Sequence, residues 1–186
     1  RGATDLAKWP SWHLRTYFIT GMAKPMPVEL TDWKDQQGWG HEDGHIGAMT
    51  AFFCEHDSLT KAQQAAIDWQ GLGLPVPTVC VWSGGKSAHW YWTLSEPITD
   101  LWRWRWMTWR LIQITGSDRV IENWSRLMRL PGCFNIDAQG AITSRAVIDP
   151  TLCCGLPVTL AAFEHALVVA EAKRGWTRWI PSPRRR

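Results

Sequence analysis

An apolar run at residues 47–54 ends abruptly in three polar side chains, Glu55, His56 and Asp57. A short run of small and aromatic residues bounded by polar ones is typical of a strand in the middle of a sheet. The sequence therefore predicts a central strand whose end brings two carboxylates to the rim of the core. In extended chain, Glu55 and Asp57 would share one face, about 6.5–7 Å apart.

Strand-like and helix-like segments alternate around this run. We expect strands at residues 78–82, 87–94 and 141–148, and helices at 60–70, 100–114 and 159–173. Ser58 and Asp100 are expected to cap the first two helices, and Gly116 to end the second. Residues 9–39 are expected to form a brief helix followed by irregular chain. This order of elements predicts an α/β (α+β) fold.

Residues 1–186 are expected to form a single domain, with a flexible tail at the Pro- and Arg-rich residues 174–186. The chain begins without Met, so we expect it to be part of a longer protein. No run of about 18 apolar residues is present, which predicts a cytoplasmic protein with no membrane partner. The five cysteines are scattered and form no CxxC pair, so neither a disulfide framework nor a zinc ribbon is indicated.

Charge is divided unequally along the chain. Residues 1–100 hold 7 Lys and Arg against 11 Asp and Glu, a net charge of −4, whereas residues 101–186 hold 13 against 6, a net charge of +7. The second half is therefore a candidate face for nucleic acid or phosphate. The 15 tryptophans can fill a core or stack on bases, and for most of them the core is the stronger expectation.

Three short motifs have the residue types of a phosphate and metal site. The acidic pair Glu55 and Asp57 can hold divalent cations through oxygen ligands of the kind that Mg²⁺ and Mn²⁺ prefer, although an isolated pair also fits a solvated strand end. Lys86, Ser87 and His89 lie on a predicted hairpin, where an ammonium, a hydroxyl and an imidazole could face one anion. The text GKS is not a phosphate-binding P-loop, because Cys80 stands where that motif needs glycine and a strand follows.

The third motif begins at Asp118, which could supply a third carboxylate or simply cap a turn. Arg126 and Arg129 follow it. Three residues apart on a helical turn, they would point the same way and could grip a phosphate, although each could also be an ordinary surface charge.

In order, the texts FFCEHD, SGGKSAHWYW, GSD and RLMRLPGCFN resemble the archaeo-eukaryotic primase superfamily, particularly its primase-polymerase and plasmid or phage replication branches. The likeness spans residues 45–136. It implies a compact two-lobed core with a mostly antiparallel central sheet flanked by helices. Glu at position 55 departs from the Asp often found there, but both residues ligate metals.

The resemblance also implies a function and a site. The chain would be a template-dependent DNA primase or polymerase that transfers a nucleotide from a dNTP or NTP to the 3′-hydroxyl of a primer or initiating nucleotide, using two Mg²⁺ or Mn²⁺ ions. The metal-binding, catalytic residues would be Glu55, Asp57 and Asp118, and the nucleotide-binding residues Lys86, Ser87, His89, Arg126 and Arg129. Its partners would be single-stranded template, primer and nucleotide, with a helicase or further domain in the full-length protein, in a prokaryotic or viral setting.

Two other functions are compatible with the same residues. A replication-initiator module could keep the fold and bind DNA without turnover. A metal-dependent nuclease also uses clustered carboxylates, but the Ser-x-His pair and two arginines suit a triphosphate better than a diester. No zinc-binding module like that of many relatives is recognisable, which leaves strand initiation by this core open.

Overall fold

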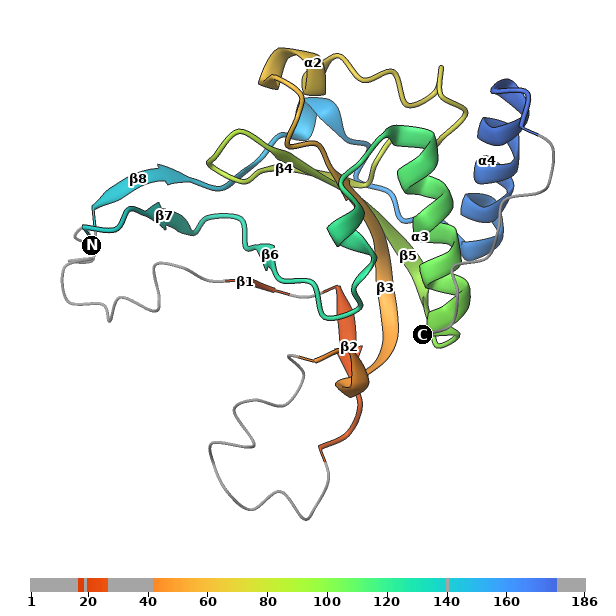
Figure 1. Cartoon of the computed structure of the whole chain (residues 1–186), viewed down its shortest axis with the longest axis horizontal. Coiled ribbons are helices and arrows are strands. Elements are labelled where there is room, and N and C mark those ends of the chain that lie inside the picture. The colour runs from red at the N-terminus through yellow and green to blue at the C-terminus, as the bar shows by residue number, and fades with distance from the viewer. Residues whose placement is uncertain (1–16, 19, 27–41, 140, 177–186) are drawn as a thin grey trace.

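The computed structural model describes residues 17–18, 20–26, 42–139 and 141–176. Its centre is a five-stranded antiparallel sheet with the strand order β2-β3-β5-β4-β9 (Figure 1). The strands are β2 (Gly21–Ala23), β3 (Ile46–Glu55), β4 (Val79–Trp82), β5 (Ala88–Ile98) and β9 (Val147–Ile148). The two long strands, β3 and β5, lie side by side in the middle and form most of the ladder.

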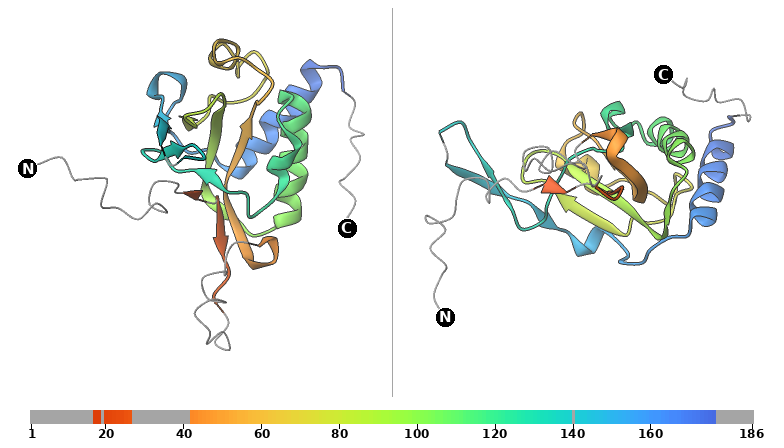
Figure 2. Two further views of the ribbon diagram at one scale, coloured as in Figure 1. Left: turned by 60° about the vertical axis from the view of Figure 1, so that its left-hand side comes forward. Right: turned by 90° about the horizontal axis from the view of Figure 1, so that it is seen from below.

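Two helices, α3 (Leu101–Thr115) and α4 (Leu160–Lys173), cover one face of the sheet (Figure 2). Asp100 caps α3 by accepting a hydrogen bond from the Arg103 N–H, and Gly116 ends it with φ of 71°, a left-handed conformation that glycine adopts without strain. These capping residues are the ones predicted from the sequence.

The core lies between the sheet and these helices. Phe52 stacks on Phe163 of α4 with ring centroids 4.4 Å apart, and Trp104 of α3 donates its indole N–H to the Ala51 carbonyl at 2.9 Å. Trp90 and Trp92 of β5 point the same way and meet Trp69 edge to face. These tryptophans are buried and fill the core, whereas Trp102 and Trp176 are exposed.

The opposite face of the sheet, here called the open face, carries the alternate side chains. Glu55 of β3 is paired with His89 of β5, and Phe53 with Tyr91. Residues 124–139 and 141–146 include β6 (Met128–Arg129), β7 (Phe134–Ile136) and β8 (Ile142–Arg145), and Pro131 of this segment lies beside Tyr91 on the open face. Strand β6 pairs with β1 (Tyr17–Phe18), while β7 and β8 form a hairpin that extends away from the helices (Figures 1 and 2).

The described residues also include four short helices: α2 (Lys61–Ala65), η3 (Asp43–His45), η4 (Arg119–Glu122) and η5 (Pro150–Leu152). The prediction of a mixed α/β fold with a mostly antiparallel sheet is confirmed. Most of residues 9–39, and the tail from residue 177, lie outside the described residues.

The helix predicted at residues 60–70 is wrong in its length and its cap. Thr60, not Ser58, is the N-cap: its hydroxyl accepts from the Gln63 N–H while the Gln63 side chain accepts from the Thr60 N–H. The helix ends after five residues, and the Asp68 carboxylate then accepts from the Gly71 N–H, which favours a turn over further helix.

The strand predicted at residues 141–148 is two strands. Ala146 separates them because its N–H and carbonyl bond to Cys133 and Gly132, so β8 joins the hairpin and β9 joins the main sheet. The helical turn predicted for Arg126 and Arg129 is also wrong. Met128 and Arg129 form the extended strand β6, and the Ser125 N–H and hydroxyl both bond to Asp43 just before it.

Candidate active site

Glu55 is the central carboxylate of the site. It is the last residue of β3, 5% exposed, and its Oε2 lies 3.3 Å from Nε2 of His89 on the neighbouring strand. Its other oxygen, Oε1, accepts a hydrogen bond from Nη2 of Arg126 at 2.7 Å. Glu55 of the first motif and His89 of the second motif therefore meet because they are paired in the register of β3 and β5. Arg126 of the third motif contacts the same carboxylate.

Asp57 reaches the site from the turn after β3, not from the strand itself. The expectation that Glu55 and Asp57 share one strand face is therefore wrong, because β3 stops at Glu55 and His56 turns inward. The exposed Asp57 accepts a hydrogen bond from the hydroxyl of the buried Ser87, which immediately precedes β5. The hydrogen bond between Ser87 and Asp57 is therefore a second contact between the first and second motifs.

Asp118 approaches the same place through the backbone of Glu55. The Asp118 N–H donates to the Glu55 carbonyl at 3.1 Å, and Ser117 beside it hydrogen-bonds the Glu55 backbone in both directions. The Asp118 carboxylate also caps η4 by accepting from the Val120 N–H. The predicted capping role of Asp118 is therefore observed, and its role as a third metal-binding carboxylate stays a prediction.

The charges of the site act on one another. Burial raises the pKa of Glu55, Arg126 opposes this rise, and the negative charges of Asp57 and Asp118 add to it. Burial, reinforced by the positive charges of Arg126 and Arg129, lowers the pKa of His89 to about 4. The imidazole is therefore neutral near pH 7, and one of its nitrogens is a donor while the other is an acceptor.

Of the other two predicted basic residues, Arg129 lies near this centre, whereas no contact joins the Lys86 side chain to it among the described residues. Arg129 donates a hydrogen bond from Nη1 to the Phe134 carbonyl at 3.2 Å, and its positive charge helps to lower the pKa of His89. Lys86 is exposed in the turn between β4 and β5, and its carbonyl accepts a hydrogen bond from Gln64. The Nε of Arg126 is buried without a hydrogen-bond partner in the described structure, so the guanidinium retains an unmet donor beside the carboxylates.

The sequence motifs do not predict the roles of two residues that position the site, Ser117 and Gln64. Ser117 links the third motif to Glu55, and its only sequence signal is its place beside Asp118. Gln64 is fully buried and bonds Leu59, Lys86 and Ala88, which fixes the β4–β5 turn against the loop that carries Asp57. A glutamine on a short polar helix gives no local sign of such a role.

The donor chemistry of the site fits a divalent cation, since carboxylate oxygens are the ligands that Mg²⁺ and Mn²⁺ prefer. The described residues nevertheless contain no group of three or more His, Cys, Asp and Glu side chains gathered as a metal centre. Both Glu55 oxygens face nitrogen atoms of Arg126 and His89. Glu55 would have to exchange these neighbours in order to bind a cation.

The sheet and its two covering helices have the fold of a primase-polymerase domain. A solved structure with this fold is the AEP domain of the primase-polymerase (PrimPol) of cyanophage S-2L. It is 27% identical to this chain, with a TM-score of 0.62, and the likeness covers 84% of this chain and 70% of that one. No family model and no curated protein matches the sequence.

No helix among the described residues is both long enough and apolar enough to cross a bilayer.

Proposed function

We propose that this chain is a template-dependent primase-polymerase domain, which transfers a nucleotide from a dNTP or NTP to a 3′-hydroxyl. The observation that carries the proposal is the convergence of Glu55, His89 and Arg126 at the end of the central strand pair, with Ser87 bonded to Asp57 beside them. The shared fold with a phage PrimPol domain supports it.

The acids and the bases have separate roles in this proposal. Two Mg²⁺ or Mn²⁺ ions held by Glu55, Asp57 and Asp118 would supply the positive charge that activates the 3′-hydroxyl and neutralises the triphosphate and the leaving pyrophosphate. The chain itself binds and orients the nucleotide, and no protein nucleophile takes part.

Each nucleotide-binding residue can offer at least one hydrogen-bond donor to a triphosphate. The Ser87 hydroxyl, the His89 N–H and the Arg126 guanidinium converge on the acidic cluster, and Arg129 adds positive charge beside it. Lys86, exposed in the turn before β5, is included from the resemblance to the primase superfamily. His89 acts here as a hydrogen-bond donor, because a buried imidazole with a pKa of about 4 is a weak base at neutral pH.

Template and primer would be held by the basic second half of the chain through phosphate contacts, with exposed tryptophans such as Trp102 available for base stacking. A helicase partner remains a prediction from the resemblance to the primase superfamily.

The test is primer extension on a DNA template with each nucleotide set and with Mg²⁺ or Mn²⁺. Asp57→Asn should abolish extension while the protein stays folded, because Asp57 is exposed. Asp68→Asn is the matched control: Asp68 is also exposed in a loop, and asparagine can still accept from the Gly71 N–H.

The rival functions give different results in the same assay. DNA binding without incorporation by the wild-type chain would favour a replication-initiator module. If the wild-type chain cleaved the template and Asp57→Asn did not, a metal-dependent nuclease would be favoured.

A further inference from the structure

Tyr91 is a buried residue beside the proposed nucleotide site and has no role assigned above. It lies on β5 two residues after His89, so the two side chains share the open face of the sheet. Its hydroxyl lies 3.4 Å from Nδ1 of His89. Nε2 on the far side of the same imidazole lies 3.3 Å from Oε2 of Glu55. His89 thus contacts Glu55 across the strand pair and Tyr91 along its own strand.

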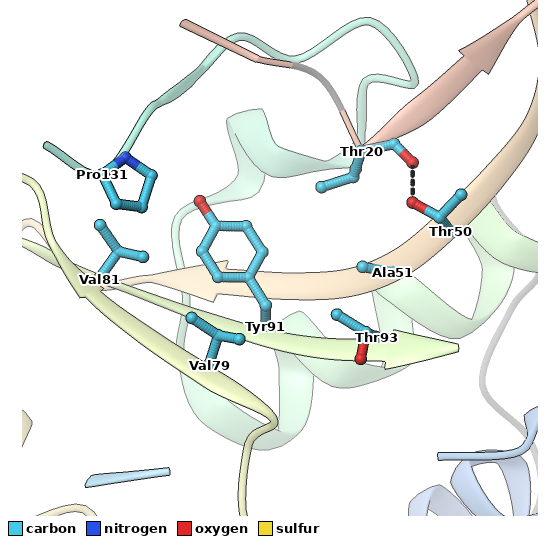
Figure 3. A pocket seen from close by; sticks show the side chains of 8 residues that line it. All are labelled: Thr20, Thr50, Ala51, Val79, Val81, Tyr91, Thr93 and Pro131. Carbon is cyan, nitrogen blue, oxygen red and sulfur yellow. Dashed lines mark hydrogen bonds between the residues drawn. The ribbon is translucent and has the colours of Figure 1, made fainter. Parts of the chain in front are cut away.

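The surroundings of Tyr91 hold its ring in place. Figure 3 shows the ring rising from β5 between Val79 and Thr93, with its hydroxyl end toward Pro131. These residues line a pocket of about 230 Å³ whose walls are mostly apolar. Only 3% of Tyr91 is exposed. The ring is thus buried with neighbours on both sides, and the pocket lies beside it.

The direction of the hydrogen bonds follows from Glu55. A carboxylate oxygen is an acceptor, so Nε2 of His89 must carry a proton in order to bond to it. In a neutral imidazole Nδ1 is then an acceptor and needs a donor, because an unsatisfied buried acceptor costs free energy. A tyrosine hydroxyl carries its proton at neutral pH, so it can be that donor.

We propose that Tyr91 is a positioning residue that acts through His89: its hydroxyl donates to Nδ1 and fixes the imidazole with its Nε2–H directed at the acidic site. When a nucleotide binds, that N–H is already aimed at the triphosphate. The 3.4 Å contact is long, and contacts of this kind commonly shorten once ligand is bound. The inference rests on the proposed phosphate contact of His89, but part of its test does not.

The first test reads the imidazole directly in the full chain without ligand. In nitrogen-15 NMR of the six histidines, the resonances of His89 are identified because they disappear in His89→Ala. They should show that His89 carries its proton on Nε2. In Tyr91→Phe the Nδ1 resonance of His89 should move toward that of an acceptor without a donor. A wild-type proton on Nδ1, or an Nδ1 resonance unchanged in Tyr91→Phe, would overturn the proposal.

The second test measures binding of inorganic triphosphate with Mg²⁺, which needs neither template nor turnover. Tyr91→Phe should weaken binding about threefold to tenfold, the worth of one hydrogen bond. If Tyr91 acts through His89, the same substitution should have no further effect in the His89→Ala background. Thr93→Val removes a hydroxyl two residues along the same face of β5, and should leave binding unchanged in both backgrounds.

The outcomes separate this inference from the proposed function. Equal losses from Tyr91→Phe with and without His89 would mean that Tyr91 acts independently, and the inference would be wrong. If the wild-type chain bound no triphosphate at all, the proposed function would fail, and the NMR result alone would decide the role of Tyr91.

Discussion

The hydroxyl of Ser117 accepts a hydrogen bond from the Glu55 N–H at 3.0 Å and donates one to the Glu55 carbonyl at 2.8 Å. The two residues are 62 positions apart in the sequence. The Ser117 hydroxyl thus bonds to both backbone polar groups of Glu55, the last residue of the central strand. It also places Asp118 next to Glu55, because the following N–H bonds to the same carbonyl.

Ser117→Ala should therefore loosen the third carboxylate without removing any proposed catalytic group. We expect a loss of about 1–3 kcal/mol in the free energy of unfolding, because the buried Glu55 N–H loses the Ser117 acceptor and the Glu55 carbonyl loses one of its two donors. We also expect a fall of about tenfold or more in kcat/KM for primer extension, since misplaced catalytic groups are costly. Urea denaturation and steady-state kinetics measure the two effects. Ser95→Ala, on the exposed part of β5, should change neither.

Gly84→Ala should disturb the β4–β5 turn. Gly84 has φ of +83°, and an added Cβ would lie 2.6 Å from Nδ2 of Asn135 and 2.9 Å from the carbonyl carbon of Arg145. Both neighbours belong to the β7–β8 hairpin, so strain and steric overlap act together. We expect a loss of about 1–3 kcal/mol in the free energy of unfolding.

Gly85→Ala is the control for this substitution. The atom nearest to an added Cβ at Gly85 is the Ser83 hydroxyl, 3.7 Å away, which is ordinary van der Waals contact. Equal midpoints of denaturation for the two variants would show that the turn does not depend on the contact between Gly84 and the hairpin.

Gln64→Ala should destabilise the protein by about 2–4 kcal/mol, because its amide satisfies buried backbone groups of both Lys86 and Ala88. Gln113→Ala changes an exposed glutamine on α3, and should shift the free energy of unfolding by less than about 0.5 kcal/mol. If the two variants unfolded at the same urea concentration, the proposed anchoring by Gln64 would be refuted.

His89 should make stability depend on pH. Its pKa is lowered from 6.5 to about 4 in the folded state, so between these values the unfolded chain binds the proton and the folded chain does not. Stability should therefore fall as the pH drops from 6.5 to 4, by roughly 3 kcal/mol more in the wild type than in His89→Gln.

Glu55 acts in the opposite direction, because its raised pKa reduces stability as the pH rises above 4.5. Its contribution is present in both proteins, so the comparison isolates the histidine. Denaturation curves at several pH values in a chelating buffer would measure the difference. Parallel stability curves for the two proteins would contradict the buried, neutral state of His89.

Local patterns predict the elements that carry the site better than they predict its geometry. The run ending at Glu55, the strand carrying His89 and the helix from Asp100 to Gly116 each have a clear local signal, and the structure contains all three. Arg126 and Arg129 do not follow the expected helical spacing, because contacts with Asp43 and β1 hold that segment extended. Such contacts join residues far apart in the sequence, and no local pattern records them.

The residues of the candidate site lie on secondary-structure elements of different stability. Glu55 and His89 belong to the longest strand pair of the sheet, whereas Asp118 lies just before a four-residue 3₁₀ helix and Arg126 lies in a loop. Backbone amides of the long ladder should exchange with solvent only on global unfolding, while those near Asp118 and Arg126 should exchange through small local openings. The arginine could thus leave the carboxylate and return many times while the acid–imidazole pair stays in place, which would let ligands enter without disturbing the core.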